Sequence, residues 1–228
     1  MSELAIIQLH TLRAELAALP RRSATLLIGV DGPGGAGKSL FARALAAGVP
    51  SATVVEMDDF FRPSSERLPG DPRDKLVGAD FDWPRLCEQV LRPLAAGATA
   101  RYQRYDWDAD RLAEWREVAP GGMVIVEGVY CTRDELAGFY DFRIWIACPR
   151  ELRLARGIAR SGERIREIWE RDWMVAEDLY IAAQRPRERA NLVLDGSGRV
   201  THDPSSECIV LIASGQPRSD DARSDRKG

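Results

Sequence analysis

The sequence predicts an α/β fold, in which a five-stranded, mostly parallel sheet has helices on both faces. Three observations support this prediction. Short apolar segments of strand length recur along the 228 residues, stretches of helical character separate most of them, and a glycine cluster directly follows the first apolar segment. A strand that helices cover on both faces is buried on both sides, so its sequence is apolar throughout instead of alternating.

Five segments are predicted to be strands of this sheet. Three of them run directly into an acidic residue, at positions 58, 127 and 195. The carboxyl ends of parallel strands meet at one edge of a sheet, where ligands bind in open α/β folds. In chain order the predicted strands are residues 26–30, 53–57, 123–126, 142–147 and 191–194.

Helices are predicted from apolar spacing and from their end signals. Residues 4–19 repeat apolar side chains at spacings of three and four, which predicts one amphipathic helix ended by the following proline. Residues 39–47 predict a second helix, closed by a glycine and a proline. Residues 149–185 predict a long helical region that is interrupted near residues 157 and 162.

The segment between the second and third predicted strands, residues 62–122, is too long for a simple crossover. We interpret it as an insertion that closes or recognises a ligand, and not as a second domain. It contains a loop rich in proline and glycine, a helix start signal, and two segments rich in aromatic and charged residues: residues 62–78, 82–84, 101–107 and 113–118, respectively.

The remaining boundaries follow from composition. Residues 1–213 are predicted to form a single domain, with a lid at about residues 153–166. Residues 214–228 are rich in Ser, Asp and Arg and are predicted to be disordered.

Composition excludes several classes of protein. The net charge of −3 without a Lys/Arg block gives no electrostatic reason to expect nucleic-acid binding. No apolar run approaches the roughly 18 residues of a membrane span, and the first residues lack a secretory cleavage pattern. The four cysteines form no C-x-x-C pair, so neither a zinc site nor a disulfide framework is predicted. We therefore expect a cytoplasmic protein.

Residues 32–39, Gly-Pro-Gly-Gly-Ala-Gly-Lys-Ser, match the phosphate-binding pattern G-x-x-x-x-G-K-[ST] between a strand and a helix. Glycines let such a loop wrap tightly, so that successive backbone N–H groups point at phosphate oxygens. Lys38 would bring a positive charge to the β- and γ-phosphates, and the Ser39 hydroxyl would bind Mg²⁺. The alternative is a glycine-rich turn without a ligand. The predicted nucleotide-binding residues of this loop are Gly32, Gly34, Gly35, Ala36, Gly37, Lys38, Ser39 and Leu40.

Acidic residues at the strand ends are candidates for chemistry on the phosphate. Asp58 or Asp59 could accept the proton of an attacking hydroxyl, or hold Mg²⁺ through water, although an Asp pair after a strand is also ordinary turn chemistry. Glu127 ends the third predicted strand at a Walker-B-like position that suits the water shell of a metal ion. The predicted metal site is Ser39, Asp58 and Glu127.

Arg153, Arg156 and Arg160 share one helix face, since their spacing is i, i+3, i+7. A closing lid that carries arginines would neutralise the oxygens of a transferring phosphoryl group, and Arg156 is the predicted catalytic member. The alternative is a solvated face on which nearby glutamates pair with these arginines.

Aromatic side chains gather in the insertion at Tyr102, Tyr105, Trp107 and Trp115. They could stack on the ring of a ligand or form the small core of the insertion itself. His202, near the end of the predicted domain, is expected to be an ordinary half-buried or surface histidine.

These residues together resemble the uridine kinase and phosphoribulokinase-like group of P-loop small-molecule kinases, from about Leu26 to Asp195. The phosphate loop is the first marker. Residues 58–62, Asp-Asp-Phe-Phe-Arg, look like the family segment D-x-F-Y-[KR], and residues 80–84, Asp-Phe-Asp-Trp-Pro, are similar to N-F-D-x-P. Residues 124–128 match an apolar run that ends in Glu-Gly.

The resemblance implies a P-loop NTPase fold with an acceptor-binding insertion and a lid, and it implies roles for individual residues. Asp58 would be the general base, Asp82 a ligand of the acceptor hydroxyl, and Glu127 a magnesium-site residue. Tyr102 falls where uridine kinases place a tyrosine that contacts the base.

Three departures from the family pattern concern the acceptor and the lid. Phe61 replaces a tyrosine, Trp107 falls near the histidine that uridine kinases use on the pyrimidine, and residues 160–163 replace the R-G-R-D lid sequence. The predicted acceptor-binding residues are Asp58, Phe61, Asp82, Tyr102 and Trp107.

The sequence therefore predicts an ATP- and Mg²⁺-dependent kinase that phosphorylates a hydroxyl of a small molecule. A nucleoside is the first candidate acceptor; another hydroxylated metabolite, a vitamin precursor or an antibiotic stays open. The alternative from another class is a nucleotide-dependent switch NTPase without a metabolite acceptor. No nucleic-acid or membrane partner is expected, and assembly into a homo-oligomer stays open.

Overall fold

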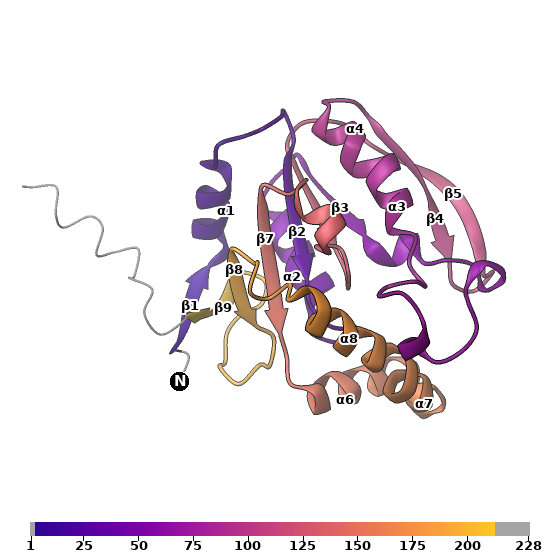
Figure 1. Cartoon of the computed structure of the whole chain (residues 1–228). Coiled ribbons are helices and arrows are strands. Elements are labelled where there is room, and N and C mark those ends of the chain that lie inside the picture. Colours follow the sequence, from indigo (N-terminus) through magenta and orange to yellow (C-terminus); the bar gives the residue numbers. More distant parts are fainter. Residues whose placement is uncertain (1–2, 213–228) are drawn as a thin grey trace, which may run out of the picture.

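The computed structural model describes residues 3–212, and a seven-stranded sheet lies at its centre (Figure 1). The five predicted strands are present and run parallel to one another, while two further strands extend the sheet antiparallel at one side. In sheet order the strands are β1 (Glu3–Gln8), β9 (Glu207–Ile212), β8 (Leu192–Asp195), β7 (Phe142–Ala147), β2 (Leu26–Asp31), β6 (Met123–Glu127) and β3 (Ala52–Glu56).

The predicted helix over residues 4–19 is wrong in its first part. Residues 3–8 form β1, which pairs with β9, and only α1 (Leu9–Ala17) is helical. The apolar stripe of α1 is real, because Leu9, Leu12 and Leu16 are buried. The side chains of β1 alternate between the two faces of the sheet, and pairing with a strand from the other end of the chain decides their conformation. The strand β9 was not among the predicted strands.

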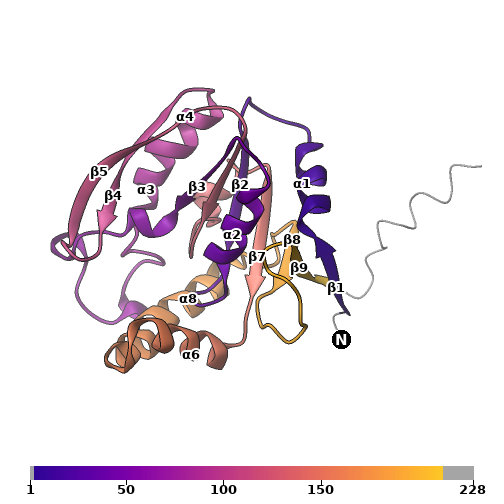
Figure 2. The ribbon, with the colours of Figure 1, turned by 180° about the vertical axis from the view of Figure 1, so that it is seen from behind.

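Helices cover both faces of the sheet, as predicted, and the two faces have separate apolar cores. In β2, Leu26, Ile28 and Val30 point into the core covered by α1 and α2 (Lys38–Ala47), whereas Leu27 points into the core on the opposite face. Figures 1 and 2 show α2 on one face and α8 (Met174–Gln184) on the other. The sheet thus separates α2 from α8.

The insertion is a helical segment followed by a two-stranded antiparallel ribbon (Figure 1). The helical segment begins after Asp82, whose side chain caps it, and it contains a π-helical turn. The two aromatic segments of the sequence are the ribbon strands. The elements are α3 (Trp83–Leu86), the π-helical turn Cys87–Leu91, α4 (Arg92–Ala95), β4 (Ala100–Asp106) and β5 (Arg111–Val118).

The predicted helical region after β7 is broken once near its middle, at Gly162 (φ 86°), and is not interrupted at Gly157. A methyl group on Gly157 would lie 2.4 Å from Cε2 of Trp169, so glycine is required there for close packing. The elements of this side are α5 (Asp134–Ala137), α6 (Arg150–Ser161), α7 (Arg166–Ile168), the π-helical turn Trp169–Trp173 and α8.

The predicted disordered tail, residues 214–228, lies outside the described residues. Within residues 3–212, no helix is both long enough and apolar enough to cross a membrane.

Candidate functional site

The phosphate loop connects β2 to α2 at the carboxyl edge of the sheet. Gly35 and Gly37 adopt positive φ angles of 74° and 101°. Gly35 has a second reason to be glycine, because a Cβ there would lie 2.7 Å from the carbonyl oxygen of Arg153. These glycines turn the loop over the N-terminus of α2, where unpaired N–H groups and the helix dipole favour an anion.

The backbone amides of this loop fall into two groups. In its first half, Gly32 N–H donates to Oδ1 of Asp31 (2.7 Å) and Gly34 N–H donates to Oε1 of Glu177 (2.9 Å). In its second half, five amides have no hydrogen-bond partner among residues 3–212: those of Gly35, Gly37, Lys38, Ser39 and Leu40. The free donors are all members of the predicted phosphate-binding set.

Lys38 is buried, and its Nζ donates to the carbonyl oxygen of Pro33 over 3.1 Å. Its positive charge lowers the pKa of three surrounding carboxyl groups, on Asp58, Glu127 and Glu177, in each case against a larger opposing effect of desolvation. The lysine is therefore near enough to act electrostatically on all three carboxyl groups, and it is the first residue of α2, beside the free amides.

Asp58 and Glu127 lie at the carboxyl ends of two neighbouring strands, β3 and β6. Glu127 is buried; desolvation raises its pKa, and Lys38 and a hydrogen bond from Ser39 oppose that rise. Asp58 follows β3 in a 3₁₀ turn and its side chain is exposed. Desolvation by the surrounding protein raises its pKa, and the charges of Lys38 and Arg160 act in the opposite direction.

The residues fit a magnesium nucleotide. Within the described chain, no three His, Cys, Asp or Glu side chains converge on a point that could hold a metal ion. Mg²⁺ usually takes only one or two protein ligands and completes its octahedron with water and phosphate oxygens. Ser39, beside the free amides, and Glu127, whose pKa the Ser39 side chain lowers, match that requirement.

Asp59 differs from its neighbour, because it points away from the phosphate loop. It is buried and accepts hydrogen bonds from the Tyr102 hydroxyl (3.0 Å) and from Arg116 (3.2 Å). Tyr102 is also buried and stacks on Phe60. In this structure the Tyr102 hydroxyl is used on Asp59 and its ring packs in the core on one face of the sheet, and its contact with an acceptor stays a prediction.

Asp82 has a structural role that the sequence analysis recognised only as a helix start. Its carboxylate accepts a hydrogen bond from the backbone N–H of Arg85 (3.2 Å) and forms ion pairs with the side chains of Arg62 (3.2 Å) and Arg85 (3.4 Å). If Asp82 also binds an acceptor hydroxyl, as predicted, that hydroxyl has to share the carboxylate with the guanidinium groups of Arg62 and Arg85.

Phe61 and Trp107 stack on one another, with ring centroids 4.5 Å apart. Phe61 is buried, and Tyr105 and Phe81 meet its edge. Trp107 remains 48% exposed. The rings pack on one another, as one of the two interpretations predicted, and stacking of the exposed Trp107 on a ligand stays a prediction.

The three arginines of α6 do not act as one face. Arg153 is buried in an ion pair with Glu177 (2.8 Å). Arg156 donates to the carbonyl oxygens of Gly35 (3.1 Å) and Gly196 (2.8 Å), on the outer side of the phosphate loop. Arg160 is exposed, and of the three only its charge lowers the pKa of Asp58.

A cavity of about 570 Å³ adjoins the phosphate loop on the side of Arg156. Its walls come from the start of α2 and from the connection between β8 and β9, and they are largely apolar. A planar nucleobase is a suitable occupant, because the cavity is continuous with the loop that would hold the phosphates. Among its lining residues are Leu40, Phe41, Ile146, Arg156, Leu194 and His202.

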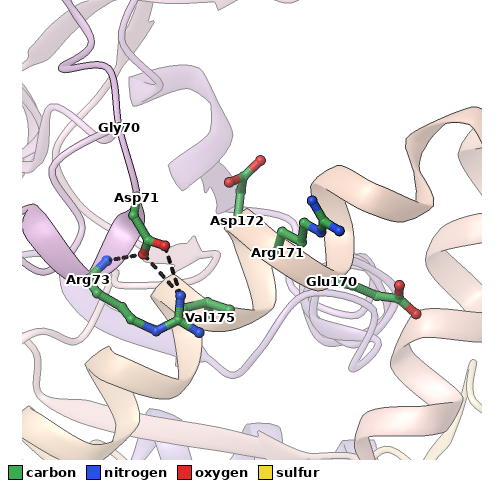
Figure 3. Close-up of a pocket in the computed structure, with 7 residues that line it drawn as sticks. All are labelled: Gly70, Asp71, Arg73, Glu170, Arg171, Asp172 and Val175. Atoms are coloured by element: carbon green, nitrogen blue, oxygen red, sulfur yellow. Dashed lines mark hydrogen bonds and ion pairs between the residues drawn. The ribbon is translucent and has the colours of Figure 1, made fainter.

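A second cavity, of about 480 Å³, separates the insertion loop from the helices after the lid (Figure 3). Asp71 and Arg73 pair on the loop side (2.9 Å), and Glu170, Arg171 and Asp172 lie on the helical side. The loop touches α8 at the edge of this cavity, and most of the side chains that line it are charged.

Several residues of this site were missed. Asp31, Tyr180 and Glu177 surround the first half of the phosphate loop. A signal for two of them exists, because Glu177 and Tyr180 are three residues apart and so share a helix face. Their partners lie more than 140 positions away in the chain, however, and no local pattern reveals such contacts.

The site was compared with known proteins. Residues 27–170 match the family model for the phosphoribulokinase/uridine kinase family. The uridine kinase of Alkaliphilus metalliredigens is 24% identical over 187 residues, which are 76% of this chain and 88% of that enzyme. A solved structure from Bacillus stearothermophilus, described as a possible uridine kinase, aligns with a TM-score of 0.65 and 25% identity over 81% of this chain and 96% of that one.

Another relative differs in length. Inorganic pyrophosphatase TTM2 of Arabidopsis thaliana is 29% identical over 154 residues, which are 63% of this chain. The match covers 21% of that plant protein, and a second Arabidopsis relative, TTM1, is covered over 22%.

Proposed function

This chain belongs to the phosphoribulokinase/uridine kinase family, and from that premise we propose that it transfers the γ-phosphoryl group of ATP to a hydroxyl group of an uncharged small molecule. The observation that carries the proposal is the geometry around Lys38. Five unpaired backbone amides, a buried lysine and an accessible carboxylate, Asp58, meet at the carboxyl edge of the sheet.

Each group has a role in the transfer. The free amides and Lys38 hold the triphosphate, and Ser39 with Glu127 would hold the metal ion. A bound Mg²⁺ would neutralise charge on the phosphate oxygens. Asp58 accepts the proton of the acceptor hydroxyl, and Arg160 adds positive charge on the same side as Asp58.

Asp58 suits the role of base better than Asp59 does. A general base must reach the proton that it removes, and Asp58 is the open member of the pair. Asp59 is occupied by Tyr102 and Arg116 and lies behind it. The rise in the pKa of Asp58 brings its proton affinity closer to neutral pH, where a carboxylate is a better base.

The charges of the insertion support an acceptor without a phosphate or carboxylate group. An anionic acceptor would need an available cation, yet five cations of the insertion each lie in an ion pair. These pairs are Arg62–Asp82 (3.2 Å), Lys75–Asp80 (3.5 Å), Arg85–Asp82 (3.4 Å), Arg104–Glu114 (2.6 Å) and Arg116–Asp59 (3.2 Å).

Release of ADP in the presence of candidate acceptors tests the proposal. Nucleosides, neutral sugars and amino alcohols form one set; sugar phosphates and hydroxy acids form the other. We expect stimulation by members of the neutral set, and no turnover in the Lys38→Ala variant. Lys75→Ala is the matched control, because Lys75 lies in the insertion and pairs with Asp80.

Two outcomes would contradict the proposal in different ways. A sugar phosphate or hydroxy acid as the best acceptor would overturn the inference about charge. ADP release at one rate with every acceptor and with none would favour a switch NTPase, the alternative that sequence left open.

A further inference from the structure

Helix α8 touches the phosphate loop through two polar side chains on one face. Glu177 accepts a hydrogen bond from Gly34 N–H (2.9 Å), and the Tyr180 hydroxyl donates to Oδ2 of Asp31 (2.7 Å). Both side chains are buried. A residue spacing of i, i+3 places them one turn apart, so a single helix reaches two points of the same loop.

Asp31 is the second anchor. It is buried directly before the loop and accepts four hydrogen bonds: from Gly32 N–H, from the N–H and hydroxyl of Thr132, and from Tyr180. The carboxylate thereby ties the end of β2 to the turn after β6 and to α8. A carboxylate with so many donors fixes its neighbours in one arrangement.

Glu177 also joins the lid to the loop. Its second oxygen forms an ion pair with Arg153 of α6 (2.8 Å), and the backbone of Arg153 lies against Gly35. Trp169 packs against Gly34, because a Cβ on that glycine would lie 3.0 Å from the indole ring. The first half of the loop is thus enclosed by α8, by α6 and by a buried indole.

We propose that Glu177 and Asp31 are positioning residues for phosphate binding. They hold the first half of the loop by its Gly34 and Gly32 amides, so that the five free amides of the second half converge before ATP arrives. Neither carboxylate contacts the phosphates, and both act through the backbone. This inference rests on the proposed ATP-dependent function.

The separation of the two halves has a physical reason. A carboxylate in the second half would repel the phosphates, whereas in the first half it satisfies amides that would otherwise be buried without partners. Arg153 offsets the charge of Glu177, and neutral donors from Gly32, Thr132 and Tyr180 satisfy the carboxylate of Asp31. Preorganised donors bind more tightly because ordering them costs nothing further at the moment of binding.

Substitutions at Glu177 separate positioning from bulk stability. Glu177→Gln keeps an oxygen for Gly34 N–H, and Glu177→Ala removes it. We expect Glu177→Ala to raise the KM for ATP and the Kd for ADP by about ten- to a hundredfold, the loss of one charge-assisted hydrogen bond. The KM for the acceptor should stay within about twofold, and Glu177→Gln should restore most of the affinity. Asp178→Ala is the matched control, since Asp178 is exposed on the same helix and pairs with Arg150 on the surface.

A second variant guards against misfolding. Tyr180→Phe keeps the ring and removes only the hydrogen bond to Asp31, and we expect a rise of a few fold in the Kd for ADP by calorimetry, with the melting temperature little changed. Parental ADP affinity in Tyr180→Phe and in a folded Glu177→Ala protein would overturn the positioning role. A parent that binds no ADP or ATP would instead overturn the proposed function.

Discussion

The phosphate loop, here the nucleotide side, and the insertion differ in how their polar groups are paired. On the nucleotide side, donors are left without partners: the second half of the phosphate loop has five free amides above buried Lys38. On the insertion side, most cations lie in ion pairs with neighbouring carboxylates, and Phe61 packs with other aromatic rings. The first arrangement suits a highly charged ligand, and the second is the basis for the proposal of an uncharged acceptor.

This difference explains why the nucleotide is easier to predict from the sequence than the acceptor is. A triphosphate needs backbone donors and one cation, which many sequences can supply through the same short motif. A neutral acceptor needs shape and a few hydrogen bonds, and these come from side chains that the insertion brings together from distant segments. The predictions below test the contrast between the two sides, from the largest effect to the smallest.

The chemical step should depend most on the residue between the two sides. Asp58→Asn keeps the shape and removes the proton acceptor, so we expect the acceptor-dependent rate to fall about 10²–10⁴-fold while ATP still binds. The base works when ionised, so the parent's rate should fall as the pH drops through a pKa that lies above 3.8. Asp74→Asn, in the exposed loop, is the control. Full acceptor-dependent turnover in the Asp58→Asn variant would show that Asp58 is only a residue of the turn after β3 and not the base.

The nucleotide side should tolerate added volume poorly. In Gly157→Ala the new methyl group would meet Trp169 at 2.4 Å and press the indole toward Gly34. Overpacking costs about 1–3 kcal/mol, more than the roughly 1 kcal/mol that Ala gains in a helix, so the free energy of unfolding should fall. Gly138→Ala is the control, because Gly138 has open space and a φ of −69°. Denaturant unfolding of both variants measures the difference; equal stability would show that Trp169 has room to move.

The fold and the site were only partly predictable from sequence. The phosphate loop, its flanking strand and the helix after it are local features, so residues 26–47 were predicted almost as observed. The pairing of β1 with β9 joins opposite ends of the described chain, and a local helical spacing concealed it. The position of Glu177 could not be predicted either, since its contact with Gly34 spans 143 residues.

The arginines of α6 show a further limit of prediction from sequence. Their shared face on α6 was predicted correctly as geometry, but a helix face does not say which neighbour each side chain meets. Arg153 forms an ion pair with Glu177, and Arg156 donates to the backbone at the edge of the cavity beside the phosphate loop. The charge of Arg160 lowers the pKa of Asp58. Tertiary contacts therefore divided one sequence pattern into three roles.

This division predicts opposite kinetic effects for two neighbouring arginines. Arg156→Ala removes hydrogen bonds that shape the nucleobase cavity, so the KM for ATP should rise about tenfold with a smaller change in kcat. Arg160→Ala should lower kcat with little change in that KM, because Arg160 lies beside the reacting groups. Initial rates at varied ATP concentration separate the two. A fall in kcat alone for Arg156→Ala would restore the original prediction that it acts on the transferring phosphoryl group.

The smallest effect belongs to the insertion side, where Asp110 joins the ribbon tip to the loop after β3. Its carboxylate accepts hydrogen bonds from the Ser64 hydroxyl and N–H and from the Tyr105 hydroxyl, and they lower the pKa of Asp110 to about 2. A lowered pKa means that ionised Asp110 favours the folded form. Its contribution is present above the ordinary value of 3.8 and is lost as the pH falls through about 2.

Asp110→Asn should therefore lower the melting temperature slightly at pH 6, and the difference from the parent should shrink as the pH falls from about 4 toward 2. The fluorescence of Trp107, which stacks on Phe61 beside this contact, should change over the same range in the parent and not in the variant. Asp108→Asn, at the exposed ribbon tip, is the control. A difference in melting temperature that persists unchanged to pH 2 would show that the Asp110 contact works through shape and not through charge. In that case the ion pairs of the insertion would have to be tested individually before its neutrality is used to predict the acceptor.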